Sequence, residues 1–89
     1  MYKILIVEDD ETIAGGLKNH LEKWNYQAEC MTDFKDVMGK FVEFEPQLVL
    51  LDIVLPFFNG FHWCQEIRKV SKVPVLFISS ANESMNIVM

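Results

Sequence analysis

Acidic and hydroxyl side chains directly follow three short apolar runs of the sequence. Glu8 and Asp9 follow the first of these runs, Asp52 ends the second and Ser79 ends the third. If the runs are neighbouring strands of a parallel sheet, their carboxyl ends meet at one edge, where such folds bind ligands. Carboxylates held this close cannot all ionise cheaply, and a hard divalent cation relieves their repulsion. The sequence therefore predicts a Mg²⁺ site at this edge.

Phosphoryl transfer is the chemistry that such a site favours. A carboxylate beside bound Mg²⁺ can attack phosphorus to give an aspartyl phosphate, because the metal neutralises charge and aligns the attack. Each signal also has a simpler explanation: the acids at 8–11 could form a solvated helix cap, Asp52 could end a turn, and Ser79 could cap a helix. The simpler account needs three coincidences at one edge, so we favour the phosphoryl interpretation.

The elements that would position these side chains alternate between two sequence periods. Short, mostly apolar runs typical of buried strands occupy residues 2–7, 26–31, 47–52 and 74–79. Between the runs, apolar residues recur at helical spacing and predict three amphipathic helices, and a fourth helix is predicted to start at Asn82. This alternation predicts an α/β fold with three layers, in which helices cover both faces of a parallel sheet.

Two of the predicted helices carry capping signals at their starts. Asp10 or Glu11 is expected to cap the first helix, and Thr32 or Asp33 the second. The first helix also contains the pair at 15–16, two glycines, each of which costs roughly 1 kcal/mol relative to alanine inside a helix. The sequence offers no reason for this pair.

Composition limits the possible functions. The 89 residues are 51% hydrophobic with a net charge of −5, which predicts one packed domain that does not bind nucleic acid directly. Neither a membrane span nor a secretory segment is recognised. Cys30 and Cys64 lack metal-ligand spacing. We therefore expect a cytoplasmic protein with two free thiols and no membrane contact.

The three motifs resemble those of the response regulator receiver family (CheY-like). The stretches KILIVEDD, LVLLDIVLPFFNG and VPVLFISSAN stand in the family's order and span the chain. The resemblance implies a flavodoxin-like parallel sheet, with strand order 2-1-3-4-5, and a phosphoryl group accepted on Asp52. It also implies that Asp9 binds Mg²⁺ directly, Glu8 through water and Val54 through its backbone carbonyl. Ser79 would contact a phosphoryl oxygen and rearrange on activation.

The resemblance also implies partners. We expect a signalling domain rather than an enzyme, which accepts its phosphoryl group from a sensor histidine kinase and can form a homodimer. The sequence looks like the class whose receivers precede a winged-helix (OmpR-type) DNA-binding domain, so DNA would be contacted only through that domain. The stretch GFHWCQEIR is similar to the subgroup beside peptide-antibiotic transporters. Residues 1–89 would be a receiver incomplete at its C-terminal end, without the family's fifth strand, fifth helix or DNA-binding domain.

Two other functions share parts of the pattern. A flavodoxin-like cofactor-binding domain would cradle phosphate with the loop after the first strand, but the acidic loop at 8–11 would repel an anion. A Mg²⁺-dependent phosphatase with an aspartyl-phosphate intermediate would carry a DxD pattern after that strand. Glu8 and Asp10 occupy those positions here, and glutamate is a poor substitute. Both remain alternatives to the receiver.

Overall fold

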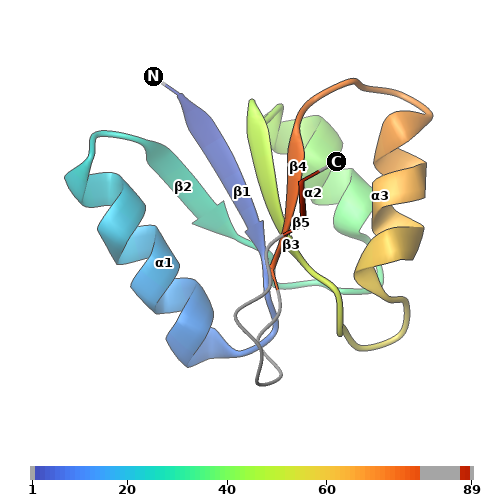
Figure 1. Cartoon of the computed structure of the whole chain (residues 1–89), viewed down its shortest axis with the longest axis horizontal. Coiled ribbons are helices and arrows are strands. Elements are labelled where there is room, and N and C mark those ends of the chain that lie inside the picture. The colour runs from blue at the N-terminus through green and yellow to red at the C-terminus, as the bar shows by residue number, and fades with distance from the viewer. Residues whose placement is uncertain (1, 79–86, 89) are drawn as a thin grey trace.

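A computed structural model of the chain describes residues 2–78 and 87–88, and it has three layers (Figure 1). The elements run in the order β1 (Lys3–Val7), α1 (Glu11–Lys23), β2 (Gln27–Cys30), α2 (Val37–Phe44), β3 (Leu48–Asp52), α3 (Gly60–Arg68), β4 (Val75–Ile78) and β5 (Ile87–Val88). The sheet order is β2-β1-β3-β4-β5, and its first four strands are parallel. Helix α1 covers one face, and α2 and α3 cover the other. The predicted three-layer α/β fold is confirmed.

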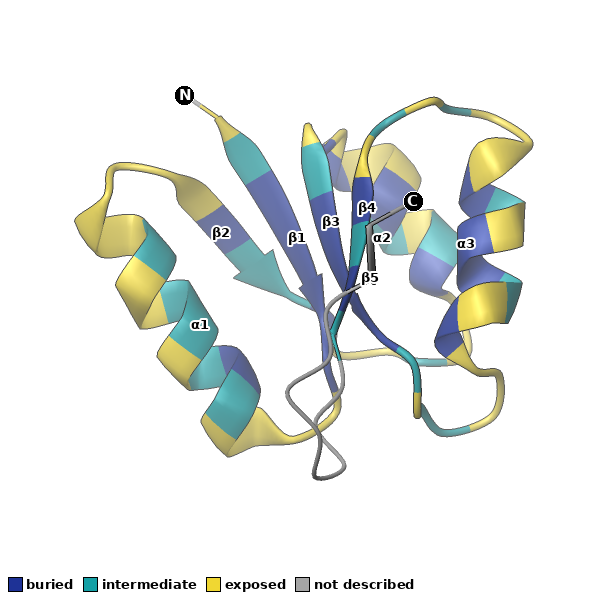
Figure 2. Cartoon of the chain, in the orientation of Figure 1, coloured by how far each residue is buried: buried dark blue, intermediate teal, exposed yellow. Residues whose placement is uncertain are grey.

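The two faces of the sheet bury separate apolar clusters. Leu5 and Val7 of β1 pack into the cluster shared with α2 and α3, whereas Ile4 and Ile6 pack into the cluster under α1. Figure 2 shows β1 and β3 buried almost along their whole length. A strand that is covered on both faces must be apolar at successive positions, and this explains why the strands are continuous apolar runs in the sequence.

The sheet edge at β4 differs from the prediction. A helix was predicted from Asn82, and the family's fifth strand was expected to be absent. Residues 82–86 lie outside the described part of the chain, but β5 is a strand that pairs antiparallel with β4, with Ile87 opposite Phe77. An apolar edge strand has unpaired backbone donors and acceptors, and any paired strand satisfies them. Local helical spacing cannot reveal such a long-range contact.

The start of one helix was predicted correctly and that of the other was not. Asp10 caps α1, since its side chain accepts from the N–H groups of Thr12 and Ile13. The cap of α2 is Asp36, whose Oδ1 accepts from a backbone N–H at 3.0 Å. Asp33 instead accepts from the N–H of Lys35 and closes a turn before the helix. Because either aspartate can cap a helix, the sequence signal was ambiguous.

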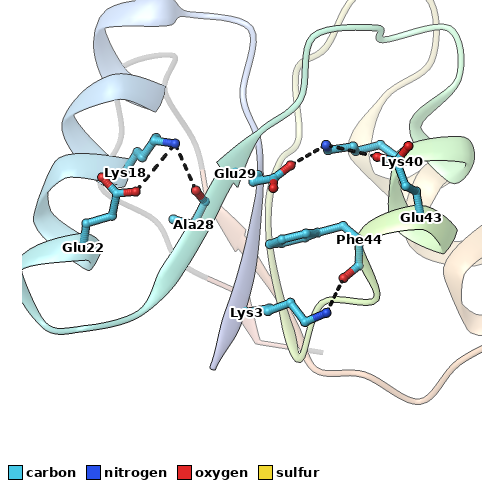
Figure 3. A network of polar contacts seen from close by, with 8 residues as sticks. All are labelled: Lys3, Lys18, Glu22, Ala28, Glu29, Lys40, Glu43 and Phe44. Atoms are coloured by element: carbon cyan, nitrogen blue, oxygen red, sulfur yellow. Dashed lines mark hydrogen bonds and ion pairs between the residues drawn. The ribbon is translucent and has the colours of Figure 1, made fainter. Parts of the chain in front are cut away.

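Charged side chains from both helical layers close the sheet edge at β2 (Figure 3). Lys18 of α1 donates to the carbonyl of Ala28 at 3.2 Å and pairs with Glu22, and Lys40 of α2 pairs with Glu29. Charges at a sheet edge oppose pairing with another chain.

In the described residues, no helix is long and apolar enough to cross a membrane. Both cysteines are free, as predicted.

Candidate metal and phosphoryl-acceptor site

The carboxyl ends of β1 and β3 lie side by side, because the strand register pairs Val7 with Leu51. Glu8 follows β1 and Asp52 ends β3, so the two side chains meet at this edge. One carboxylate oxygen from each of Glu8, Asp9 and Asp52 lies within 4.8 Å of the others. Glu8 and Asp52 are 2% and 0% exposed, whereas Asp9 is exposed. Two carboxylates thus form the floor of the site and the third stands at its mouth.

The acidic run after β1 divides into two functions. The carboxylate of Asp10 is engaged in capping α1, so the simpler explanation holds for this residue. Glu8 Oε2 accepts from the N–H of Asp10 at 3.0 Å, which fixes the Glu8 side chain. Its other oxygen, Oε1, is buried without a hydrogen-bond partner in the described part of the structure. Helix capping therefore leaves Glu8 and Asp9 available to the site.

Negative charge on the buried carboxyl groups of the site is unfavourable. The pKa of Glu8 rises from 4.5 to about 7, mainly because the group is buried; the bond from the N–H of Asp10 opposes this rise, and the neighbouring carboxylates of Asp52 and Asp9 contribute to it. A bound cation removes this penalty, because it favours the ionised form of all three groups. The donor set also fits Mg²⁺, which binds oxygen ligands and uses few carboxylates. Within the described residues, the buried Glu8 Oε1 is an oxygen of this kind and has no hydrogen-bond partner.

The loop after β3 holds the Asp52 carboxylate in place. The N–H of Val54 donates to Asp52 Oδ1 at 3.3 Å, and the N–H of Gly60 donates to the Ile53 carbonyl at 2.8 Å. A Cβ added to Gly60 would lie 2.3 Å from the Asp52 backbone oxygen, so only glycine allows this approach. Asn59 caps α3 through the N–H of residue 62. Asp52 therefore lies between a strand and a loop that is held by hydrogen bonds.

The predicted site residues have different positions in the structure. Glu8, Asp9 and Asp52 come together. Val54 follows two residues after Asp52 and is 61% exposed. Ser79 lies outside the described residues. Sequence reasoning did not foresee that the Val54 N–H would bond Asp52, because a backbone donor is independent of residue type.

Comparisons with known proteins point to one family. The family model of the response regulator receiver domain matches residues 4–89. The transcriptional regulatory protein YvcP of Bacillus subtilis is 49% identical over 89 residues, which are 100% of this chain and 38% of that protein. The response regulator protein GraR of Staphylococcus aureus is 46% identical over 87 residues, 98% of this chain and 39% of that protein. The chain thus spans about two fifths of these relatives.

Solved structures give the same result. The N-terminal domain of the nisin resistance regulator NsrR, a lantibiotic response regulator, has 47% identity and a TM-score of 0.84, covering 96% of this chain and 72% of that one. The response regulator TrrA of Thermotoga maritima, solved with Mg²⁺ and a beryllium fluoride, has 29% identity and a TM-score of 0.83, covering 92% of this chain and 72% of that one.

Proposed function

This chain belongs to the response regulator receiver family, and on that basis we propose that Asp52 accepts a phosphoryl group in a Mg²⁺-dependent reaction. It is a signalling domain of a two-component response regulator. The observation that carries the proposal is the convergence of Glu8, Asp9 and the fully buried Asp52 within 4.8 Å. A strand-ending carboxylate in this environment is held toward the edge at which α/β sheets bind ligands.

Each residue has a defined part in the proposed transfer. By the family resemblance, Asp9 and Asp52 would hold Mg²⁺ directly, Glu8 would hold it through water, and the backbone carbonyl of Val54 would be a further ligand. The metal supplies charge neutralisation on the transferring phosphoryl group. A carboxylate oxygen of Asp52 forms the new bond to phosphorus while the bond from phosphorus to the donor breaks. The Val54 N–H fixes the Asp52 carboxylate by its bond to Oδ1, which limits the geometries of attack.

The proposed partners are the protein that donates the phosphoryl group and the domain that receives the signal. A sensor histidine kinase supplies the phosphoryl group, and Ser79 contacts it after transfer. The signal then passes to a DNA-binding output domain. The names of two relatives, the transcriptional regulatory protein YvcP and the response regulator GraR, support this step. The likeness to a nisin resistance regulator supports a response to peptide antibiotics. We place the protein in the cytoplasm, where the kinase domain and DNA are both accessible.

The test is phosphorylation by a small donor. The protein is incubated with acetyl phosphate and Mg²⁺, and its intact mass is measured with and without a chelator. We expect a gain of one phosphoryl group only when Mg²⁺ is present, and no gain in Asp52→Asn. Glu43→Gln, a change at an exposed acid on α2, serves as the matched control. Phosphorylation of the Asp52→Asn protein to the same extent would refute the assignment.

A further inference from the structure

A cavity of about 460 Å³ adjoins the acid cluster and extends beyond it toward α1 and the segment after β2. Its lining combines three acids, Glu8, Asp9 and Glu11, with mostly apolar residues of α1 and of the segment after β2, among them Met31 and Phe34. Asp52 does not line it. Cavities of this volume are in the range that binds small molecules. The cavity thus extends away from the acceptor and shares two carboxylates with the metal site.

The glycines of α1 connect this cavity to the sequence. Gly15 lines the cavity, and a Cβ built on it meets no atom within 4 Å. No close contact therefore requires glycine at this position, although glycine weakens a helix. A larger side chain here would project into the cavity and occupy it. Gly16 also has open space but is not among the lining residues, and nothing in the structure explains it.

The charges around the cavity specify the ligand's sign. Among the residues that the structure describes, the cavity lining carries three carboxylates and no lysine, arginine or histidine. Glu8 is 2% exposed and lines the cavity, and its Oε1 has no hydrogen-bond partner within residues 2–78 and 87–88. A buried carboxylate oxygen without a partner is costly, and a bound cation or donor compensates for it. Because the other lining residues are largely apolar, a cation that also carries a hydrocarbon body would gain from burying it against them.

We propose that this cavity binds a small amphipathic organic cation, an ammonium or guanidinium group on an aliphatic or aromatic body. Its charged group pairs with the carboxylates of Glu8, Asp9 and Glu11. Its body packs against Met31, Phe34 and the helix surface at Gly15. Because Glu8 and Asp9 serve both sites, the organic cation and Mg²⁺ compete. This competition rests on the proposed function, whereas the binding of the organic cation does not.

Hexylammonium chloride is the probe, and its binding is followed by the amide NMR signals of Ala14 and Thr32 in metal-free protein. We expect saturable shifts, with 1-hexanol and ammonium chloride each binding at least about threefold more weakly, because each lacks one half of the chemistry. Gly15→Leu fills the cavity and weakens binding about tenfold or more. Gly16→Leu is the matched control, since it removes the same residue type one position away without entering the cavity.

Charge is tested by a second pair of variants on the same helix. Glu11→Gln should weaken hexylammonium binding about threefold, and Glu22→Gln, which changes the net charge equally outside the cavity, should leave it unchanged. Equal binding by the two leucine variants, or of hexanol and hexylammonium, overturns the proposal. A separate titration with Mg²⁺ alone shows whether the metal site exists. If Mg²⁺ binds but does not displace hexylammonium, the claim of shared carboxylates is wrong.

Discussion

Replacing Glu8 with glutamine should stabilise the metal-free protein at alkaline pH. The folded state raises the pKa of this carboxyl from 4.5 to about 7, mainly because the group is buried. At about 1.4 kcal/mol per pH unit, this difference corresponds to about 3 kcal/mol. Water at the exposed mouth of the site screens part of the cost, so we expect a net effect of about 1–2 kcal/mol.

The sign of the effect follows from proton binding. Below pH 4.5 Glu8 is protonated in both the folded and the unfolded state. The buried group is then neutral, so the folded state has no buried charge at this position and is at its most stable with respect to Glu8. Between pH 4.5 and about 7 only the folded state keeps the proton, so stability is lost progressively as the pH rises through this window. Glutamine cannot ionise and retains an oxygen that accepts from the N–H of Asp10. The stability of the Glu8→Gln variant should therefore not decrease through this pH window as that of the wild type does.

The assay is urea unfolding at pH 5.5 and pH 8 with a chelator present, followed by the fluorescence of Trp63, which is 5% exposed. We expect Glu8→Gln to exceed the wild type by about 1–2 kcal/mol at pH 8 and by clearly less at pH 5.5. Saturating Mg²⁺ should reduce or reverse the advantage, since the wild type binds it better. Glu11→Gln controls for net charge at an exposed neighbour. The same stability difference at both pH values would refute the reasoning.

Three further predictions concern the same edge of the sheet. Gly60→Ala should cost about 1–3 kcal/mol in thermal or urea unfolding, because its Cβ would lie 2.3 Å from the Asp52 carbonyl oxygen, whereas Gly16→Ala should be neutral or stabilising; equal effects would contradict the close approach. Val54→Asn should shorten the lifetime of the phosphorylated protein several-fold, measured by loss of phosphoryl mass, because a polar side chain two residues past Asp52 can orient the attacking water; an unchanged lifetime would count against this. Mg²⁺ affinity, measured by calorimetry, should rise between pH 6 and pH 8 as Glu8 loses its proton, and a flat profile would contradict a ligand role for that carboxyl.

Much of the fold could be predicted from the sequence, because buried parallel strands leave a simple pattern. The runs ending at Val7, Asp52 and Ile78 are apolar on both faces, and their ends bring polar residues to one edge. The start of α2 was harder to locate, since Asp33 and Asp36 both have capping chemistry and only tertiary packing selects between them. The antiparallel β5 could not be predicted, because its partner is a distant strand edge.

The candidate site was predictable in its residue types but not in its electrostatics. The sequence alone does not distinguish Asp10, which caps α1, from Asp9, which faces the other carboxylates. The raised pKa of Glu8 depends on burial beside Asp52, and burial is a property of the folded chain. The one sequence feature connected with the cavity is Gly15, a glycine within a helix. Its position could be interpreted only once the structure showed that it lines the cavity.

The central claim, that Asp52 is the phosphoryl acceptor, is tested most directly by locating the modified residue. After incubation with acetyl phosphate and Mg²⁺, borohydride reduces an aspartyl phosphate to homoserine, and peptide mass spectrometry then identifies the altered position. We predict homoserine at position 52 in a Mg²⁺-dependent yield and unmodified aspartate at positions 9 and 10. Homoserine at position 9 or 10, with aspartate intact at 52, would contradict the account.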